Sequence, residues 1–256
     1  MLKEERQQRI LERLGQNGKI VARELSELWQ ISEDTIRRDL NEMAALNLLH
    51  RVHGGALPKS PTAVSYRFRE GEAGDAKAAI AATCVGLLQQ DQVILMDSGT
   101  TALKVAEALP LDFRATVITN SLPVLEALSG HSRIEVIGLG GRLFRESRCL
   151  LGAEAIEGIS RVYADVCVLG ANGIHPEIGM GVLDYETVAV KTAMLNHARQ
   201  VIAVAASEKL GTVASFIFGQ ITSLTHLVTD TGASEETLKP YREAGVLVST
   251  AEGKVG

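Results

Sequence analysis

The sequence predicts an α/β protein in two parts, a winged helix-turn-helix over residues 1–57 and a larger, mostly parallel α/β domain over residues 76–256. Three short helical patterns followed by a glycine turn predict the first part. Short apolar runs that alternate with helical stretches predict the second. Residues 58–75 are polar and show no sustained periodicity, so we expect a linker there.

The composition is that of an ordinary folded protein. The chain has 256 residues, of which 46% are apolar and 22% charged, and its formal net charge is -5. The cysteines form no CxxC pair, which favours reduced core thiols over a disulfide framework. The first residues are charged and no apolar run is long enough to cross a bilayer. We therefore expect a cytoplasmic protein without a membrane partner.

The charge is unevenly distributed along the chain. Through residue 59 there are ten Lys and Arg against nine Asp and Glu, and the remaining residues carry sixteen against twenty-two. The first part is therefore less acidic than the rest, which is weak support for an anionic partner such as DNA. Because bulk charge is small, any DNA binding must depend on where basic side chains are placed.

Apolar residues at helical spacing predict the helices of the first part. The first helix has a stripe at Ile10, Leu11 and Leu14 and ends in the breaker run 15–19. The second helix has apolar positions at Ala22, Leu25, Leu28 and Trp29.

A third helix is predicted to begin after Ser32, a good N-cap followed by two carboxylates. Its buried face is expected at Ile36, Leu40 and Met43, so that Arg38 and Asn41 point the opposite way. The segment LLHRVHGGAL, residues 48–57, has a Gly-Gly turn between alternating residues and predicts a two-stranded wing.

This order of elements describes a winged helix-turn-helix, whose second motif helix enters the major groove of DNA. The candidate DNA contacts are Ser32, Thr35, Arg37, Arg38, Asn41, Arg51, His53 and Gly54. A simpler interpretation remains open for the arginine pair. Glu33 and Arg37, like Asp34 and Arg38, are four residues apart, and such ion pairs stabilise an exposed helix by about 0.2–0.5 kcal/mol each.

These residues resemble the signature of the DeoR family of bacterial transcriptional regulators. Arg9, Ile10 and Leu14 match its first helix. Residues 32–40 match the S-x-x-T-I-R-R-D-L motif of its recognition helix, and residues 51–56 match the R-x-H-G-G-A motif of its wing. The resemblance implies operator DNA as a partner. It also implies a C-terminal domain similar in fold to ribose-5-phosphate isomerase that senses sugar phosphates.

Six apolar runs predict strands in the second part: VILM (93–96), TVIT (116–119), IEVIGL (134–139), DVCVLG (165–170), QVIAVA (200–205) and HLVT (226–229). The helical stretches among them are TALKVAEAL (101–109), LPVLEALS (122–129), ETVAVKTAMLNHA (186–198) and EETLKPYREAG (235–245). This alternation predicts a parallel sheet covered on both faces, with ligands just past the carboxyl ends of strands.

Polar and glycine residues follow four of these strands, which predicts one shared pocket. DSGTT, residues 97–101, leads into a helix whose first N–H groups and hydroxyls can bind an anion. It is neither a Walker loop nor a dinucleotide fingerprint, and a Ser/Thr-rich N-cap without a ligand fits it equally well. The candidates at the strand ends are Asp97, Ser98, Gly99, Thr100, Thr101, Asn120, Ser121, Gly140, Gly141 and Asn172.

The resemblance extends over this part of the chain. The family's D-x-G-T-T, T-N-S and G-G motifs match residues 97–101, 119–121 and 140–141, and its E-x-x-x-x-K helix matches Glu186 and Lys191. It implies that Lys191 and Lys209 supply charge to a phosphate, although either could be a solvated surface lysine. The chain departs from the family at Asn172 and Ala206, where the family usually has aspartate.

The predicted function is sequence-specific regulation of transcription, as a repressor of a carbohydrate operon that a sugar phosphate modulates. A homo-oligomer, dimer or tetramer, would present paired modules to repeated half-sites. The main alternative is a sugar-phosphate isomerase or deaminase with an accessory helix-turn-helix, and a third is a scaffold whose helix-turn-helix contacts protein. Because an amide cannot take up a proton, Asn172 favours binding over catalysis. No enzymatic activity, metal or cofactor is expected.

Overall fold

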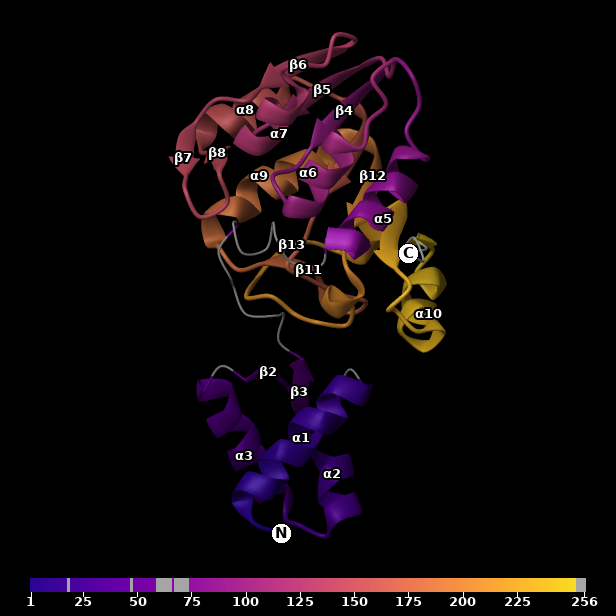
Figure 1. The fold of residues 1–256 in the computed structure, drawn as a ribbon. Coiled ribbons are helices and arrows are strands. Elements are labelled where there is room, and N and C mark those ends of the chain that lie inside the picture. The colour runs from indigo at the N-terminus through magenta and orange to yellow at the C-terminus, as the bar shows by residue number, and fades with distance from the viewer. Residues whose placement is uncertain (18, 47, 59–65, 67–73, 252–256) are drawn as a thin grey trace.

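The computed structural model describes residues 1–17, 19–46, 48–58, 66 and 74–251. The N-terminal module, indigo in Figure 1, lies at one end of the molecule and the larger α/β domain at the other. Most of the predicted linker, residues 58–75, lies outside the described residues.

The N-terminal module consists of α1 (Lys3–Asn17), β1 (Ile20–Val21), α2 (Ala22–Trp29), α3 (Glu33–Ala45), β2 (Leu49–Val52) and β3 (Gly55–Pro58). The helices and the wing occur where the sequence predicts them. Strand β1 was not predicted; it pairs with β3, so the strand order is β1-β3-β2. The predicted apolar positions Ile10, Leu25 and Ile36 meet in one core.

Local sequence explains the turn between α2 and α3. Gln30, after the last residue of α2, has a left-handed φ of 54°, which stops the helical hydrogen-bond pattern. Ser32 then caps α3, because its Oγ accepts a hydrogen bond from the Thr35 N–H at 3.3 Å. The predicted N-cap is confirmed.

Two adjacent glycines shape the wing for different reasons. Gly54 has a φ of +79°, a conformation that glycine adopts without strain, and a Cβ there would meet nothing within 4 Å. At Gly55 a Cβ would lie 1.8 Å from the backbone oxygen of Ile20. Gly55 therefore lets β1 approach β3 closely.

The larger domain is built on a sheet of β4 (Gln92–Met96), β5 (Ala115–Thr119), β6 (Ile134–Gly138), β9 (Ala164–Leu169), β12 (Ala198–Val204), β14 (His226–Asp230) and β15 (Leu247–Ala251). Its strand order is β15-β14-β12-β9-β4-β5-β6, and every pair is parallel. The six predicted strands and the parallel pairing are confirmed. The edge strand β15 was missed because its residues LVSTA are mostly exposed or half-buried and lack a clear apolar run.

The chain leaves the middle of this sheet in opposite directions. From β4 it continues outward through β5 and β6, whereas from β9 it continues through β12, β14 and β15. The switch point therefore lies between β4 and β9. Connections diverge there and leave a crevice beyond the strand ends.

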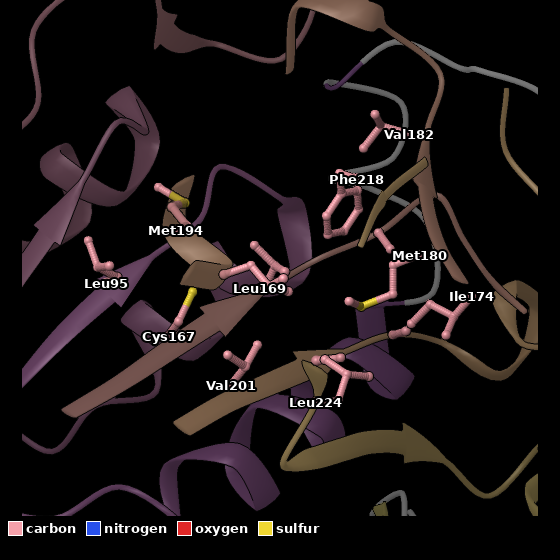
Figure 2. Close-up of a cluster of buried hydrophobic side chains, with 14 of the residues drawn as sticks. Leu95, Cys167, Leu169, Ile174, Met180, Val182, Met194, Val201, Phe218 and Leu224 are labelled. Atoms are coloured by element: carbon pink, nitrogen blue, oxygen red, sulfur yellow. The ribbon is translucent and has the colours of Figure 1, made fainter. Parts of the chain in front are cut away.

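Helices cover both faces of the sheet, as predicted. Ile94 and Met96 pack in one apolar cluster with residues of α5 (Gly74–Val85), α6 (Thr100–Glu107) and α7 (Leu122–Leu128). Leu95, between them in sequence, packs in the opposite cluster with α8 (Ala153–Ser160), α9 (Tyr185–Asn196) and α10 (Glu235–Glu243). Figure 2 shows part of this second cluster, including Leu95 and Cys167.

The cysteines are buried and unpaired, as the sequence predicts. Burial raises the pKa of the Cys84 thiol to about 12 and that of Cys149 to about 11. These thiols are protonated packing groups at neutral pH.

Several short elements were not predicted. They are the hairpin β7 (Arg142–Phe144) and β8 (Cys149–Leu151), the antiparallel sheet β10 (Gly173–His175), β11 (Gly179–Val182) and β13 (Phe216–Gly219), and the 3-10 helices η1 (Ser207–Lys209) and η2 (Ile221–Ser223). Helices α5 and α8 were missed as well. The strands are only three or four residues long, too short for a periodic pattern.

The two wing glycines give a matched test of the fold. Gly55→Ala should destabilise the N-terminal module by roughly 3 kcal/mol, because the new methyl group meets backbone. Gly54→Ala should cost about 1–2 kcal/mol, the penalty for a left-handed alanine. Trp29, the single tryptophan, packs against the module's core, so its fluorescence during urea unfolding reports this module. Equal losses in the two variants would contradict the role assigned to Gly55.

Candidate functional site

Helix α3 presents one apolar and one polar face. Ile36, Leu40 and Met43 are fully buried against the rest of the module. Arg37, Arg38 and Asn41 are exposed, and Thr35 is half-buried beside Ser32 at the start of the helix. The orientation predicted from the spacing is confirmed, and α3 has the exposed face that a recognition helix requires.

The two adjacent arginines differ in their partners. Arg37 pairs with Glu33 through Nη2 and Oε1, 2.7 Å apart, as the i, i+4 spacing allows. The corresponding pair of Arg38 with Asp34 does not form, and no described residue gives Arg38 a hydrogen bond or ion pair. Arg38 can therefore meet an external anion without first breaking an internal contact.

The wing is tied to α3 by two of the residues predicted to touch DNA. Arg51 Nε donates a hydrogen bond to Asn41 Oδ1 at 2.9 Å, and its Nη1 donates to the carbonyl oxygens of Val52, at 3.2 Å, and Gly55. Arg51 thus has structural partners in this structure. His53 and Gly54 lie at the wing's turn, where His53 is exposed.

A cavity of about 280 Å³, here called the switch-point pocket, opens beyond β4 and β9. Eight of the predicted ligand residues line it: Asp97, Ser98, Gly99, Thr100, Thr101, Asn172, Lys191 and Lys209. Gly99 is the N-cap of α6, so this helix starts at the pocket wall. Backbone N–H groups at a helix start and neighbouring hydroxyls favour an anionic group.

A buried ion pair forms the base of this pocket. Lys191 Nζ lies 2.5 Å from Asp97 Oδ2 and donates to the Gly170 carbonyl at 2.8 Å. The Gly170 N–H donates to the same Asp97 oxygen at 3.0 Å. Because Asp97 is 2% exposed and neutralises Lys191, this lysine does not provide the full positive charge expected from the sequence.

The charges around the pocket are mixed. Its carboxylates come from Asp97, Glu146 and Asp184, and its ammonium groups come from Lys191 and Lys209. Asp184 also caps α9 by accepting a hydrogen bond from the Glu186 N–H at 2.8 Å. Glu186 itself is exposed and pairs with Arg142. Such a lining can hydrogen-bond a ligand that has several hydroxyl groups.

The other predicted strand-end residues, Asn120, Ser121, Gly140 and Gly141, are not among those that line this pocket. Asn120 donates from Nδ2 to the Leu150 carbonyl at 2.9 Å, and Ser121 caps α7. Gly140 and Gly141 are exposed at the turn before β7, and a Cβ on Gly141 would lie 2.5 Å from the Leu151 oxygen. The ends of these strands therefore contact the β7–β8 hairpin.

The same hairpin contributes pocket residues that sequence reasoning missed. Phe144, Glu146 and Ser147 line the pocket although they follow no strand of the central sheet. Nothing in the local sequence signals this role, because the hairpin has two three-residue strands and reaches the pocket only through tertiary packing.

The departures from the family pattern have separate structural consequences. Asn172 lines the pocket, and its backbone N–H donates to the Gly181 carbonyl at 2.9 Å. Ala206 is buried, and the loop after it is held by Asp230, which accepts hydrogen bonds from the Ser207 N–H at 2.7 Å and the Ser207 hydroxyl at 2.8 Å. Burial opposes ionisation of Asp230, but these hydrogen bonds outweigh it and lower its pKa.

A second cavity, of about 700 Å³, lies between the N-terminal module and the larger domain and is here called the interdomain cavity. Its lining includes Lys19, Pro58, His175, Glu208 and Thr237. It is larger, but it lies away from the switch point of the sheet. Ligands of open parallel sheets bind at that point, which favours the smaller pocket.

No cluster of His, Cys, Asp and Glu among the described residues could hold a metal ion. No helix among them is long and apolar enough to span a membrane.

A solved structure of ribose-5-phosphate isomerase A from Methanocaldococcus jannaschii aligns with this chain at a TM-score of 0.39 and 14% identity. The alignment covers 53% of this chain and 54% of that one. This similarity is too low to indicate a function.

Sequence similarity to known regulators extends over most of the chain. HTH-type transcriptional repressor GlcR of Bacillus subtilis is 34% identical over 232 residues, 90% of this chain and 89% of that protein. The glycerol-3-phosphate regulon repressor of Escherichia coli is 32% identical over 231 residues, 90% of this chain and 92% of that protein.

Family models match both parts of the molecule. A model of the DeoR-like helix-turn-helix domain matches residues 6–62, and a model of the DeoR C terminal sensor domain matches residues 72–231. With the winged module and the parallel sheet described above, these matches establish that the chain belongs to the DeoR family of transcriptional regulators.

Proposed function

We propose that this protein represses a carbohydrate-metabolism operon and that a sugar phosphate bound in the switch-point pocket releases it from operator DNA. The observation that carries the proposal is the pocket itself. The pocket brings together the start of α6, hydroxyl side chains that include Ser98, Thr100 and Thr101, and Lys191 paired with Asp97. The same chain carries α3, a helix with an exposed polar face, in its N-terminal module. Two of the relatives are named repressors, one of them of a glycerol-3-phosphate regulon.

The pocket's chemistry supports a small phosphate ester as the effector. The N–H groups at the start of α6 and the hydroxyls of Ser98, Thr100 and Thr101 would bind the phosphate. Asn172, Asp184 and Glu146 would hydrogen-bond the sugar hydroxyls. A volume of about 280 Å³ is at the lower end of ligand sites, which favours one sugar unit over a nucleotide.

A continuous segment connects the pocket with the DNA-binding module. Lys209 lines the switch-point pocket, and the residues that follow it line the interdomain cavity. The Val213 N–H then donates to the carbonyl of Pro58, the last residue of β3, at 3.1 Å. Through this segment an effector would change the placement of the wing, to the extent that its affinity differs between the two arrangements.

We propose that the protein acts in the cytoplasm as a homo-oligomer. A single small module rarely supplies enough contact area for tight operator binding, and paired modules can match repeated half-sites. We also propose that it is not an enzyme. Isomerisation requires a positioned base, and the amide of Asn172 can hold a hydroxyl but cannot accept its proton.

Arg38→Ala tests the recognition helix. Operator affinity should fall about tenfold or more, the usual loss for one arginine contact to a base, while the effector response persists. Fluorescence anisotropy on a labelled operator duplex at fixed salt measures it. Arg161→Ala removes the same charge from an exposed site on the larger domain, 74% exposed, and should have no effect. Unchanged affinity in Arg38→Ala would remove this residue from the interface.

A pair of threonine substitutions tests which cavity binds the effector. Thr100→Phe should fill the switch-point pocket and abolish release by the sugar phosphate, with operator binding intact. Thr237→Phe obstructs the interdomain cavity in the same way and should leave the response unchanged. The measurement is operator release across a panel of sugar phosphates. Loss of effector binding itself, measured by calorimetry, only in Thr237→Phe would assign the effector to the interdomain cavity.

A turnover assay tests the enzyme alternative. The purified protein should convert neither ribose 5-phosphate nor glucosamine 6-phosphate above the uncatalysed rate, because the pocket lacks the base expected at Asn172. A genuine isomerase and a genuine deaminase assayed in parallel provide the positive controls. Turnover that Thr100→Phe abolishes would overturn the proposal that the pocket only binds.

A further inference from the structure

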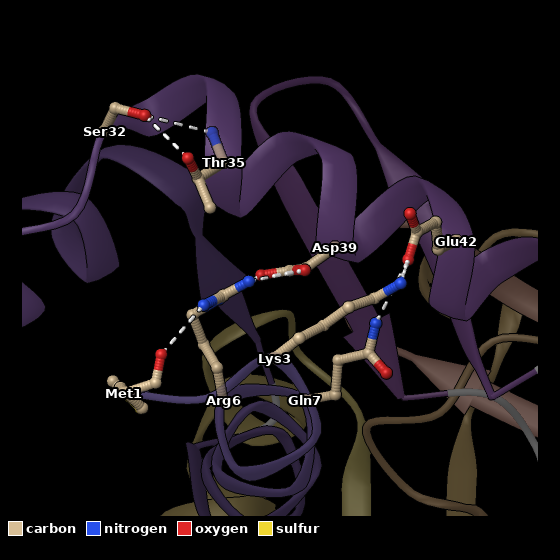
Figure 3. A network of polar contacts seen from close by, with 8 residues as sticks. All are labelled: Met1, Lys3, Arg6, Gln7, Ser32, Thr35, Asp39 and Glu42. Atoms are coloured by element: carbon tan, nitrogen blue, oxygen red, sulfur yellow. Dashed lines mark hydrogen bonds and ion pairs between the residues drawn. The ribbon is translucent and has the colours of Figure 1, made fainter.

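Helix α3 carries a buried carboxylate on its inner side. Asp39 directly follows the two arginines and is 3% exposed, an unusual position for an aspartate unless it is paired. Its partner is Arg6 of α1, 33 residues earlier in the chain. Figure 3 shows this contact between α1 and the middle of α3.

The contact between Arg6 and Asp39 is bidentate. Arg6 Nη2 donates to Asp39 Oδ1 at 3.0 Å, and Arg6 Nε donates to Oδ2. The two side chains are only 11% and 4% exposed. The carboxylate also raises the pKa of Arg6 through this hydrogen bond, so the guanidinium remains charged. A planar pair of this kind fixes direction as well as distance.

The apolar contacts of α3 cannot provide the same precision. Ile36, Leu40 and Met43 determine which face is buried, but hydrophobic burial has no preferred direction and tolerates small rotations. Arg38 adjoins Asp39 on the helix, about 100° away around the axis. If α3 rotated about its own axis, Arg38 would rotate with it. By opposing that rotation, the bidentate pair also fixes the direction of Arg38.

A second hydrogen-bonded contact lies on the outer side of the helix. Asn41 accepts the hydrogen bond from Arg51 of the wing, at 2.9 Å. By comparison, the neighbouring Lys3–Glu42 pair, 2.5 Å long, joins side chains that are 50% and 41% exposed, so water screens it. The α1 contact at Asp39 is thus the buried, directional one.

We propose that Arg6 and Asp39 are positioning residues for DNA recognition: their buried pair sets the rotation of α3, and hence the direction in which Arg38 meets a base edge. They do so without touching DNA themselves. The inference rests on the DNA-binding part of the proposed function and is independent of the effector. A pair that served only stability would be replaceable by apolar side chains, since such exchanges of buried ion pairs are often neutral or stabilising.

The double variant Arg6→Met/Asp39→Leu tests the proposal, because it removes the directional pair, keeps the net charge and leaves no unpaired buried charge. Operator affinity should fall about tenfold or more. Affinity for random DNA at the same salt should change less than about threefold, because the phosphate contacts and net charge persist. Urea unfolding followed by Trp29 fluorescence should be no weaker than in the wild type.

Two further variants test whether a loss of operator preference comes from the lost bidentate geometry or from a lost positive charge. Arg6→Lys keeps the charge but cannot form the bidentate contact. This variant should therefore show a smaller preference for operator over random DNA than the wild type. Lys3→Gln removes a positive charge three residues earlier and should retain the preference. A double variant that folds and keeps the wild-type ratio of operator to random affinity would overturn the inference alone. A wild-type protein without operator preference would overturn the DNA-binding function and the inference together.

Discussion

The buried ion pair of Asp97 and Lys191 joins the two halves of the central sheet at its switch point. Asp97 follows β4, Gly170 follows β9, and Lys191 reaches both from α9. A Cβ on Gly170 would lie 3.3 Å from the Asp97 carboxylate, so the close approach depends on a small residue there. Loss of one charged partner would leave the other buried and unpaired, which is strongly destabilising. The pair lies where two walls of the pocket begin, because Asp97 precedes α6 and Gly170 precedes Asn172.

Both domains combine apolar packing and polar pairing in the same way. Alternating side chains such as Ile94 and Leu95 determine which sheet face each element covers. Buried charge pairs lie beside the elements that bear the functional groups, Asp97–Lys191 at the start of α6 and Arg6–Asp39 on the inner side of α3. Apolar area supplies most of the stability, whereas directional contacts select one orientation among several of similar burial.

Asn172 and Ala206, the positions where the family resemblance predicts aspartate, lie in different surroundings. Asn172 lies at the pocket wall with its backbone N–H paired to the Gly181 carbonyl, and its amide side chain is not a proton acceptor. At Ala206 the adjoining loop is held by Asp230 from the neighbouring strand. The loop is therefore held in place although Ala206 itself has no polar side chain.

Periodicity and capping in the sequence were sufficient to predict the winged module, the six core strands and the outward face of α3. These features depend on neighbours within a few residues, as the cap at Ser32 illustrates. The pocket's DSGTT wall was also predictable, because a strand that leads into a helix creates it locally. Only the tertiary structure decided that Asn120 and Gly141 serve the β7–β8 hairpin, that Asp97 neutralises Lys191, and that Asp39 binds Arg6. Each of these contacts joins residues distant in the chain, and no local pattern encodes which distant partner a polar side chain will meet.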